Sequence, residues 1–207
     1  MTIIDSFLRM AFARGARERD GLLEIGGSLA VFTPVSTFVE LREELKARVG
    51  ASAAREILFE VGRKRILGGI LSLRRFPFMR TGKPRAFLGK PLAQFVLDLW
   101  RITGWGSYRV VHYDAKHALI SGSTPTAKAY LAGHDRTKEP VCDLICGMLA
   151  GGMETYHGGR YNCLERSCAA KGDAECVFEL FKRRPRGGTS PTPRGRNRSS
   201  TRKSHIT

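Results

Sequence analysis

Residues 142–176 read CDLICGMLAGGMETYHGGRYNCLERSCAAKGDAEC and contain all five cysteines of the chain. The second half of this stretch holds Glu165, Cys168 and Cys176 in the pattern E-x2-C-x7-C. Clustered thiols beside a carboxylate are typical of a metal site, of a disulfide framework or of small side chains buried together. The interpretation of the whole chain depends on which of these three holds.

The composition indicates one globular domain in a reducing compartment. With 207 residues and 42% hydrophobic content, the chain fits a single domain, which we expect over residues 1–181. No run of about 18 apolar residues suggests a transmembrane helix, and the first residues lack the basic region of a signal peptide. We therefore expect a cytoplasmic protein, where clustered cysteines bind metal more often than they form disulfides.

The positive charge is concentrated at the C-terminus. Nine of the 35 Lys and Arg residues lie within residues 182–207, without any Asp or Glu. Removing these nine charges from the net +16 leaves +7 for residues 1–181. The tail is rich in Pro, Gly and Ser and has no apolar period, so we expect it to be disordered. It could bind nucleic acid or an anionic membrane surface, or serve only as a solvated tail.

The pattern of apolar residues predicts an α/β (α+β) fold with a mainly antiparallel sheet packed against helices. A basic, aromatic-rich loop is expected over residues 74–90. The expected strands cover 22–26, 29–33, 107–113, 116–121, 160–167 and 174–181. The expected helices cover 1–20, 34–49, 51–71, 91–103, 125–131 and 139–157.

The spacing of the cysteines allows a tetrahedral zinc site. Glu165 and Cys168 lie three residues apart, and a turn containing Gly172 could return Cys176 to Cys168. Cys142, in the first turn of a separate helix, would supply the fourth donor. Three thiolates and a carboxylate are an allowed zinc set. Because this is not a common zinc spacing, the residues alone leave the metal site and the buried-thiol alternative equally open.

The segment from about residue 121 to residue 181 resembles the 4-vinyl reductase domain family. The resemblance implies a fold similar to subunits of the vesicle-tethering TRAPP complex and to ligand-binding domains of nitric oxide signalling. The family includes the sensor domains of phenol- and xylene-responsive activators and proteins linked to bacteriochlorophyll synthesis. The matching residues are Pro140-Val141-Cys142, Gly147, Gly151, Leu164-Glu165, Cys168-Ala169-Ala170, Gly172-Asp173, Cys176 and Phe178.

The resemblance also implies a ligand set for zinc. In the phenol sensors, a cysteine, a glutamate and two further cysteines bind a structural zinc beside an aromatic-ligand pocket. The corresponding residues here are Cys142, Glu165, Cys168 and Cys176. The remaining cysteines, Cys146 and Cys163, are expected to be bystanders.

A ligand pocket is expected between the helices and the sheet, lined by aromatic side chains. Each of these side chains could equally be an ordinary part of the core. The strand at residues 119–122 contains no Trp, although the phenol sensors use one, so phenol itself is not the expected ligand. The candidates are Phe95, Trp100, Trp105, Tyr108, Tyr130 and Tyr156.

These observations favour a stand-alone sensory or regulatory domain that binds a small hydrophobic or aromatic molecule and acts as a homodimer. Two alternatives are an accessory or reductase-like factor in tetrapyrrole (bacteriochlorophyll) biosynthesis and a tethering or scaffold protein. The sequence contains no phosphate-binding loop, dinucleotide fingerprint or nucleophile–base arrangement. We therefore expect binding rather than catalysis.

Overall fold

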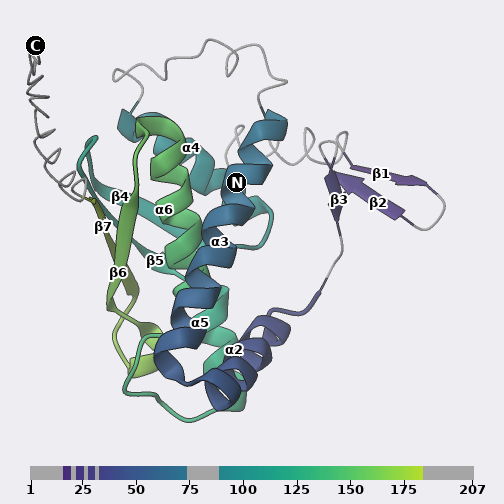
Figure 1. The fold of residues 1–207 in the computed structure, drawn as a ribbon, viewed down its shortest axis with the longest axis vertical. Helices are drawn as coiled ribbons and strands as arrows, with labels where there is room; N and C mark the ends of the chain where they lie inside the picture. The colour runs from purple at the N-terminus through teal and green to yellow at the C-terminus, as the bar shows by residue number, and fades with distance from the viewer. Residues whose placement is uncertain (1–15, 20–21, 26–27, 31–32, 74–88, 184–207) are drawn as a thin grey trace, which may run out of the picture.

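A computed structural model describes residues 16–19, 22–25, 28–30, 33–73 and 89–183 of the chain (Figure 1). Its main body is an antiparallel sheet of four strands with helices packed against it, which confirms the predicted α+β class. The loop predicted over 74–90 and the tail predicted from 182 fall almost entirely outside the described residues. Among the described helices, none is long and apolar enough to cross a membrane.

A small antiparallel sheet lies near the N-terminus. It consists of β1 (Ala16–Arg19), β2 (Leu22–Ile25) and β3 (Ser28–Ala30). The pairing of β2 with β3 confirms the predicted hairpin. The helix predicted over 1–20 is wrong for Ala16–Arg19, which pairs with β2 as a strand. The apolar helical repeat ends at Phe12, and a third strand supplies the pairing that an isolated hairpin lacks.

Five helices follow one another through the described main body, and glycine and threonine set several of their ends. Gly50 has φ +83° and ends the first helix, as predicted. That helix begins two residues later than expected, after Val35 rather than at Pro34. Thr124 accepts a hydrogen bond from the Ala127 N–H, which confirms the predicted cap. The helices are α2 (Ser36–Val49), α3 (Ala51–Leu73), α4 (Gly89–Ile102), α5 (Pro125–Gly133) and α6 (Asp143–His157).

The main sheet has the strand order β4-β5-β7-β6. The last strand in sequence therefore lies between two earlier ones, where it pairs with both β5 and β6. The inward face of the sheet carries Val110, Ile120, Phe178 and Leu180, which are buried in the core. The elements of this part are β4 (Ser107–Tyr113), β5 (His117–Ser123), β6 (Tyr161–Ser167), the short 3-10 helix η3 (Ala169–Lys171) and β7 (Cys176–Lys182).

Helices α3 and α6 are side by side and very close (Figure 1). A Cβ atom added to Gly147 would lie 2.0 Å from the Phe59 carbonyl oxygen, and one added to Gly151 would lie 2.6 Å from that of Arg63. Only glycine allows backbones to approach this closely. The pairing of 59 with 147 and 63 with 151 shows that the two helices run parallel, so their C-terminal ends lie together.

Candidate functional site

Four side chains from separate elements converge at the N-terminal end of α6. Cys142 precedes α6, Glu165 lies on β6, Cys168 precedes η3 and Cys176 begins β7. One donor atom from each of the four lies within 4.8 Å of all the others. The three cysteines are completely buried. These are the four residues that the sequence singled out, and the predicted helix start at 139 moves to Asp143, which leaves Cys142 as its N-cap.

A tight turn brings Cys168 next to Cys176. The Cys168 N–H donates to Asp173 Oδ2 at 2.7 Å, and the Lys171 N–H donates to the Cys168 carbonyl at 2.9 Å. Gly172 adopts φ +102°, in the left-handed region that favours glycine. The Ala169 N–H then donates to Cys176 Sγ at 3.4 Å. The segment between the two cysteines thus holds both sulfurs in place by its own backbone.

Glu165 bridges β6 to the start of α6. Its Oε2 accepts a hydrogen bond from the Cys142 N–H at 2.9 Å, where the positive end of the helix dipole favours a carboxylate. Its Oε1 is buried and has no hydrogen-bond partner among the described residues. Burial, together with the nearby Cys168, raises the pKa of Glu165 to about 8. A buried carboxylate oxygen without a partner is costly unless a cation satisfies it.

The thiols surrounding Glu165 differ in their tendency to ionise. Hydrogen bonds from Cys142 and Cys168, and then from the Ala169 N–H, lower the pKa of Cys176 to about 4. Burial raises the pKa of Cys142 well above its ordinary value. Thr124 Oγ1 lies 3.2 Å from Cys142 Sγ and 3.6 Å from Cys176 Sγ. The cluster therefore concentrates negative charge on sulfur in a buried space.

This donor set fits a zinc ion. Zinc accepts thiolate and carboxylate ligands in a tetrahedron, and zinc–sulfur bonds of about 2.3 Å place the sulfurs about 3.8 Å apart. Donor atoms that already lie within 4.8 Å of one another need only small shifts to reach that geometry. The orphaned Glu165 Oε1 would gain the partner that it lacks. The cluster could therefore hold a metal ion.

The two remaining cysteines form a separate pair. Neither Cys146 nor Cys163 belongs to the four-residue group. A hydrogen bond with Cys163, and then burial, raises the pKa of the Cys146 thiol. Both thiols are reduced, as are the other three.

Two of the six aromatic candidates for the pocket lie together at the centre of the core. Trp100 and Tyr108 meet edge to face with ring centroids 6.0 Å apart, and Tyr108 meets Phe178 at 6.1 Å. The Tyr108 hydroxyl donates to the Trp105 carbonyl at 2.8 Å. Burial, followed by the proximity of Cys142 and Cys176, raises the pKa of Tyr108. This aromatic group therefore lies next to the cysteine cluster.

The other four candidates are dispersed. Trp105 contacts Phe38 with ring centroids 5.8 Å apart and packs at the margin of the core. Phe95 is 36% exposed. The Tyr156 hydroxyl is buried without a partner among the described residues. Tyr130 belongs to the core and also reaches a surface hollow elsewhere.

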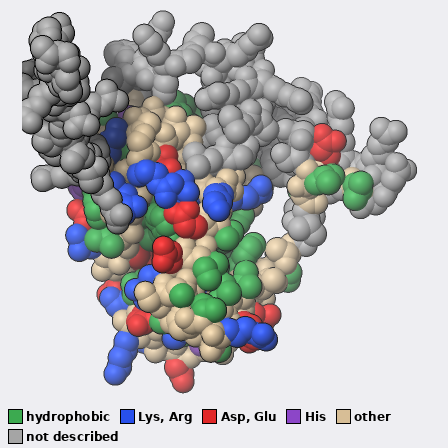
Figure 2. Space-filling view, in the orientation of Figure 1, with side chains coloured by type: hydrophobic (Ala, Val, Ile, Leu, Met, Phe, Trp, Pro, Cys, Tyr) green, Lys and Arg blue, Asp and Glu red, His purple; other side chains and the backbone are tan. Residues whose placement is uncertain are grey.

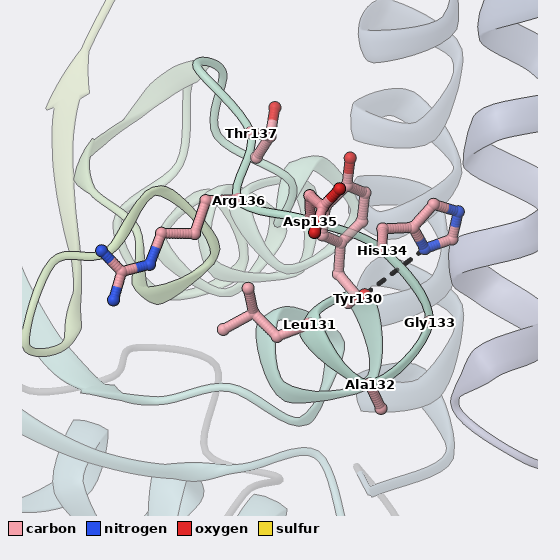
Figure 3. A pocket seen from close by; sticks show the side chains of 8 residues that line it. All are labelled: Tyr130, Leu131, Ala132, Gly133, His134, Asp135, Arg136 and Thr137. Carbon is pink, nitrogen blue, oxygen red and sulfur yellow. Dashed lines mark hydrogen bonds between the residues drawn. The ribbon is translucent and has the colours of Figure 1, made fainter.

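That hollow has a volume of about 780 Å³ and is lined by residues 130–137 (Figure 3). Tyr130 stacks on His134 with ring centroids 4.7 Å apart. The His134 Nδ1 atom lies 3.3 Å from the Tyr130 carbonyl oxygen, as the dashed line shows. The hollow is formed by the end of α5 and the segment that follows it. It does not lie between the helices and the sheet, where the sequence places the ligand.

Thr124 and Asp173 are parts of the site that sequence reasoning missed. Thr124 was identified as a helix cap, but its contacts to Cys142 and Cys176 span 18 and 52 residues of sequence. Asp173 was noted only as part of the family pattern, although it holds the Cys168 backbone. The adjacent Gly172-Asp173 turn was the one local signal for it.

Comparison with known proteins agrees with this architecture. Residues 126–182 match the family model of the 4-vinyl reductase domain. The chain therefore contains a domain of this family, in close agreement with the 121–181 expected from its residues. No curated protein matches the chain.

Solved structures with the same fold extend the likeness to most of the chain. The phenol-responsive sensory domain of the transcription activator PoxR with phenol superposes with a TM-score of 0.69 at 17% identity, covering 88% of this chain and 92% of that one. Subunit 3 of a trafficking protein particle complex from Naegleria fowleri, covalently bound to palmitic acid, gives 0.51 at 17% identity, covering 72% and 93%. The predicted TRAPP-like fold is confirmed by this second likeness. A vinyl-4-reductase family protein from Methanocaldococcus jannaschii gives 0.48 at 16%, covering 89% and 98%.

Proposed function

We propose that this chain is a sensory or regulatory domain that binds a small hydrophobic or aromatic molecule beside a structural zinc ion. The convergence of Cys142, Glu165, Cys168 and Cys176 is the observation that carries the proposal. The likeness of the fold to a phenol-responsive sensory domain supports the ligand class. At 17% identity that likeness concerns the fold, so the ligand of this chain has its own chemistry.

In this proposal the four side chains act as a structural clip. A zinc ion held by them would supply charge neutralisation and a cross-link, with no coordination position left for a substrate. Glu165 and Cys142 join β6 to the start of α6, while Cys168 and Cys176 close the turn before β7. The clip thereby fixes the elements that surround the inward face of the sheet.

The ligand would occupy the aromatic part of the core next to this clip. Trp100, Tyr108 and Phe178 present ring edges and faces to one another on the inward side of the sheet. Tyr108 lies close enough to Cys142 and Cys176 for their charges to affect its pKa. A ligand that displaces Tyr108 would therefore be felt at the metal ligands. We propose that the ligand is an apolar or aromatic molecule other than phenol, since residues 119–122 lack a Trp.

The remaining expectations enter as parts of the same proposal. The domain would act as a homodimer in a reducing cytoplasm, where its five thiols stay free. A role in tethering has the TRAPP-like fold in its favour and would require a stable complex with a different chain. A role in tetrapyrrole synthesis would require a porphyrin-sized cavity.

Native mass spectrometry of the purified full chain tests these roles in one measurement. We expect one zinc ion per chain, a co-purified small apolar molecule and a dimeric mass. A metal-free, ligand-free protein with five titratable thiols would overturn the proposal. A heteromer without a small molecule would favour tethering, and a bound tetrapyrrole would favour the biosynthetic role.

A further inference from the structure

The end of the molecule opposite the cysteine cluster has a markedly basic surface. The parallel helices α3 and α6 both finish there, and β6 begins where α6 ends. The end of β7 lies beside that start, since Lys182 pairs with Tyr161. Five exposed cations from these elements form what we term the basic end. Its members are Lys64, Arg65, Arg160, Lys182 and Arg183.

Direct contacts connect these residues into one surface. Arg160 Nη2 lies 3.2 Å from Glu60 Oε1, which places it beside α3, one turn before Lys64. The Arg183 N–H donates to the Arg160 carbonyl at 2.7 Å. Lys182 Cε would lie 2.9 Å from a Cβ added to Gly159. The basic end thus continues from α3 across the start of β6 to the end of β7, in the area where Figure 2 shows a row of Lys and Arg side chains.

The acidic side chains nearby leave most of this charge free. Glu154 is buried and pairs with the buried Arg63 at 3.0 Å. Glu60 pairs with Arg63 and Arg160, and the Arg63 hydrogen bonds hold the pKa of Glu60 below its usual value. Lys64, Arg65 and Arg183 form no ion pair with any residue that the structure describes. Unpaired cations on an exposed surface attract anions from solution.

The sequence beyond Arg183 points to the kind of anion. Residues 184–207 add seven Lys and Arg residues and no Asp or Glu, with Ile206 as the one large apolar residue. Insertion into a membrane interface requires apolar side chains among the basic ones. The residues of the basic end include none, so the interaction is electrostatic. Arginine, which supplies six of the seven cations after Arg183, is well suited to phosphate because its planar fork binds two oxygens at once.

We propose that the basic end binds the phosphate backbone of nucleic acid without reading its sequence. Lys64, Arg65 and Arg183 would contact successive phosphates, and the tail that follows Arg183 would extend the same contact. Such binding releases condensed counterions, so its affinity depends steeply on salt. This inference is independent of the ligand pocket and of the metal.

Fluorescence anisotropy with a labelled DNA duplex of about 30 base pairs tests the proposal in the full chain. The test variant is Lys64→Glu/Arg183→Glu, and the control is Lys128→Glu/Lys138→Glu, which changes the same charge near the N-terminal end of α6. We expect the test variant to lose about tenfold in affinity at about 100 mM salt, with its salt slope reduced by about 2. The control should stay within about twofold of wild type.

Two outcomes would overturn the proposal. The first is an equal loss in both double variants, which would show that net charge rather than position matters. The second is binding of the wild type to phosphatidylserine vesicles without binding to the duplex, which would indicate a membrane surface instead. Circular dichroism verifies that the variants fold, and Lys64→Gln/Arg183→Gln with the matched Gln control replaces any variant that does not.

Discussion

Helix α6 connects two regions that use charge in opposite ways. At its N-terminus, four donor side chains are enclosed, and burial together with the nearby Cys168 raises the pKa of Glu165 to about 8. Beyond its C-terminus, Arg160 and its neighbours in the basic end lie in solvent. A buried polar group strongly affects stability because no water compensates it, whereas an exposed charge mainly affects what approaches the surface. The four predictions below test this contrast, beginning with the largest expected effect.

Removing a sulfur from the buried cluster should cause the greatest loss. We expect Cys168→Ser and Cys176→Ser to lose zinc and to lower the free energy of unfolding by about 3–5 kcal/mol, because zinc binding energy is folding energy and a buried charge loses its partner. Urea denaturation and metal analysis measure both effects. Cys163→Ser, outside the cluster, should keep its zinc. Full stability of both cluster variants would contradict the clip.

Packing between α3 and α6 should be nearly as sensitive. Gly147→Ala places a Cβ 2.0 Å from the Phe59 carbonyl oxygen, so the helices must separate. We expect a loss of about 1–3 kcal/mol in thermal or urea unfolding. Gly152→Ala is the matched control on the same helix, since nothing lies within 4 Å of its added Cβ. It should stabilise α6 by about 0.5–1 kcal/mol. Equal effects at both positions would refute the close approach.

The Thr124 hydroxyl has two roles that a pair of variants can separate from simple packing. It caps α5 through the Ala127 N–H and lies 3.2 Å from Cys142 Sγ. Thr124→Val should lower the free energy of unfolding by about 1–2 kcal/mol, because the helix loses its cap. Thr124→Ser keeps the hydroxyl and should retain most of the stability. If the two variants unfold alike in urea, the hydroxyl has no such role.

The smallest effect is expected at Asp114, an exposed residue in the turn between β4 and β5. Hydrogen bonds from the Lys116 N–H, from His112 and from the His117 N–H lower the pKa of Asp114 to about 2. A lowered folded-state pKa gives stability that is present above the unfolded value near 3.8 and is lost as the pH falls towards 2. Solvent screening limits this to a few tenths of a kcal/mol.

Carbon-detected NMR titration of the carboxyl group measures its pKa directly. In Asp114→Asn the pH dependence of unfolding between about pH 4 and pH 2 should become slightly shallower than in wild type. A carboxyl group that titrates near its ordinary value of about 4 would show that these hydrogen bonds do not persist in solution.

Several features could be predicted because they depend on neighbours in sequence. Gly50 ends a helix through its own backbone conformation, and Thr124 caps one three residues away. The order of helices and strands follows the same local periodicities, with ends displaced by up to four residues. β1 was mistaken for helix because the strand β2 that pairs with it outweighed local preference.

The cysteine-rich stretch shows where prediction from sequence stops. The identity of the four donors follows from their chemistry and order, because few residue types bind zinc and the turn at Gly172 is local. Only the tertiary structure decided that Glu165 Oε1 would be buried without a partner and that Tyr108 would lie beside Cys142. It also separated Tyr130 from Trp100 and gathered five cations at the far end of α6. Burial and proximity arise from segments distant in the chain, and no local pattern encodes them.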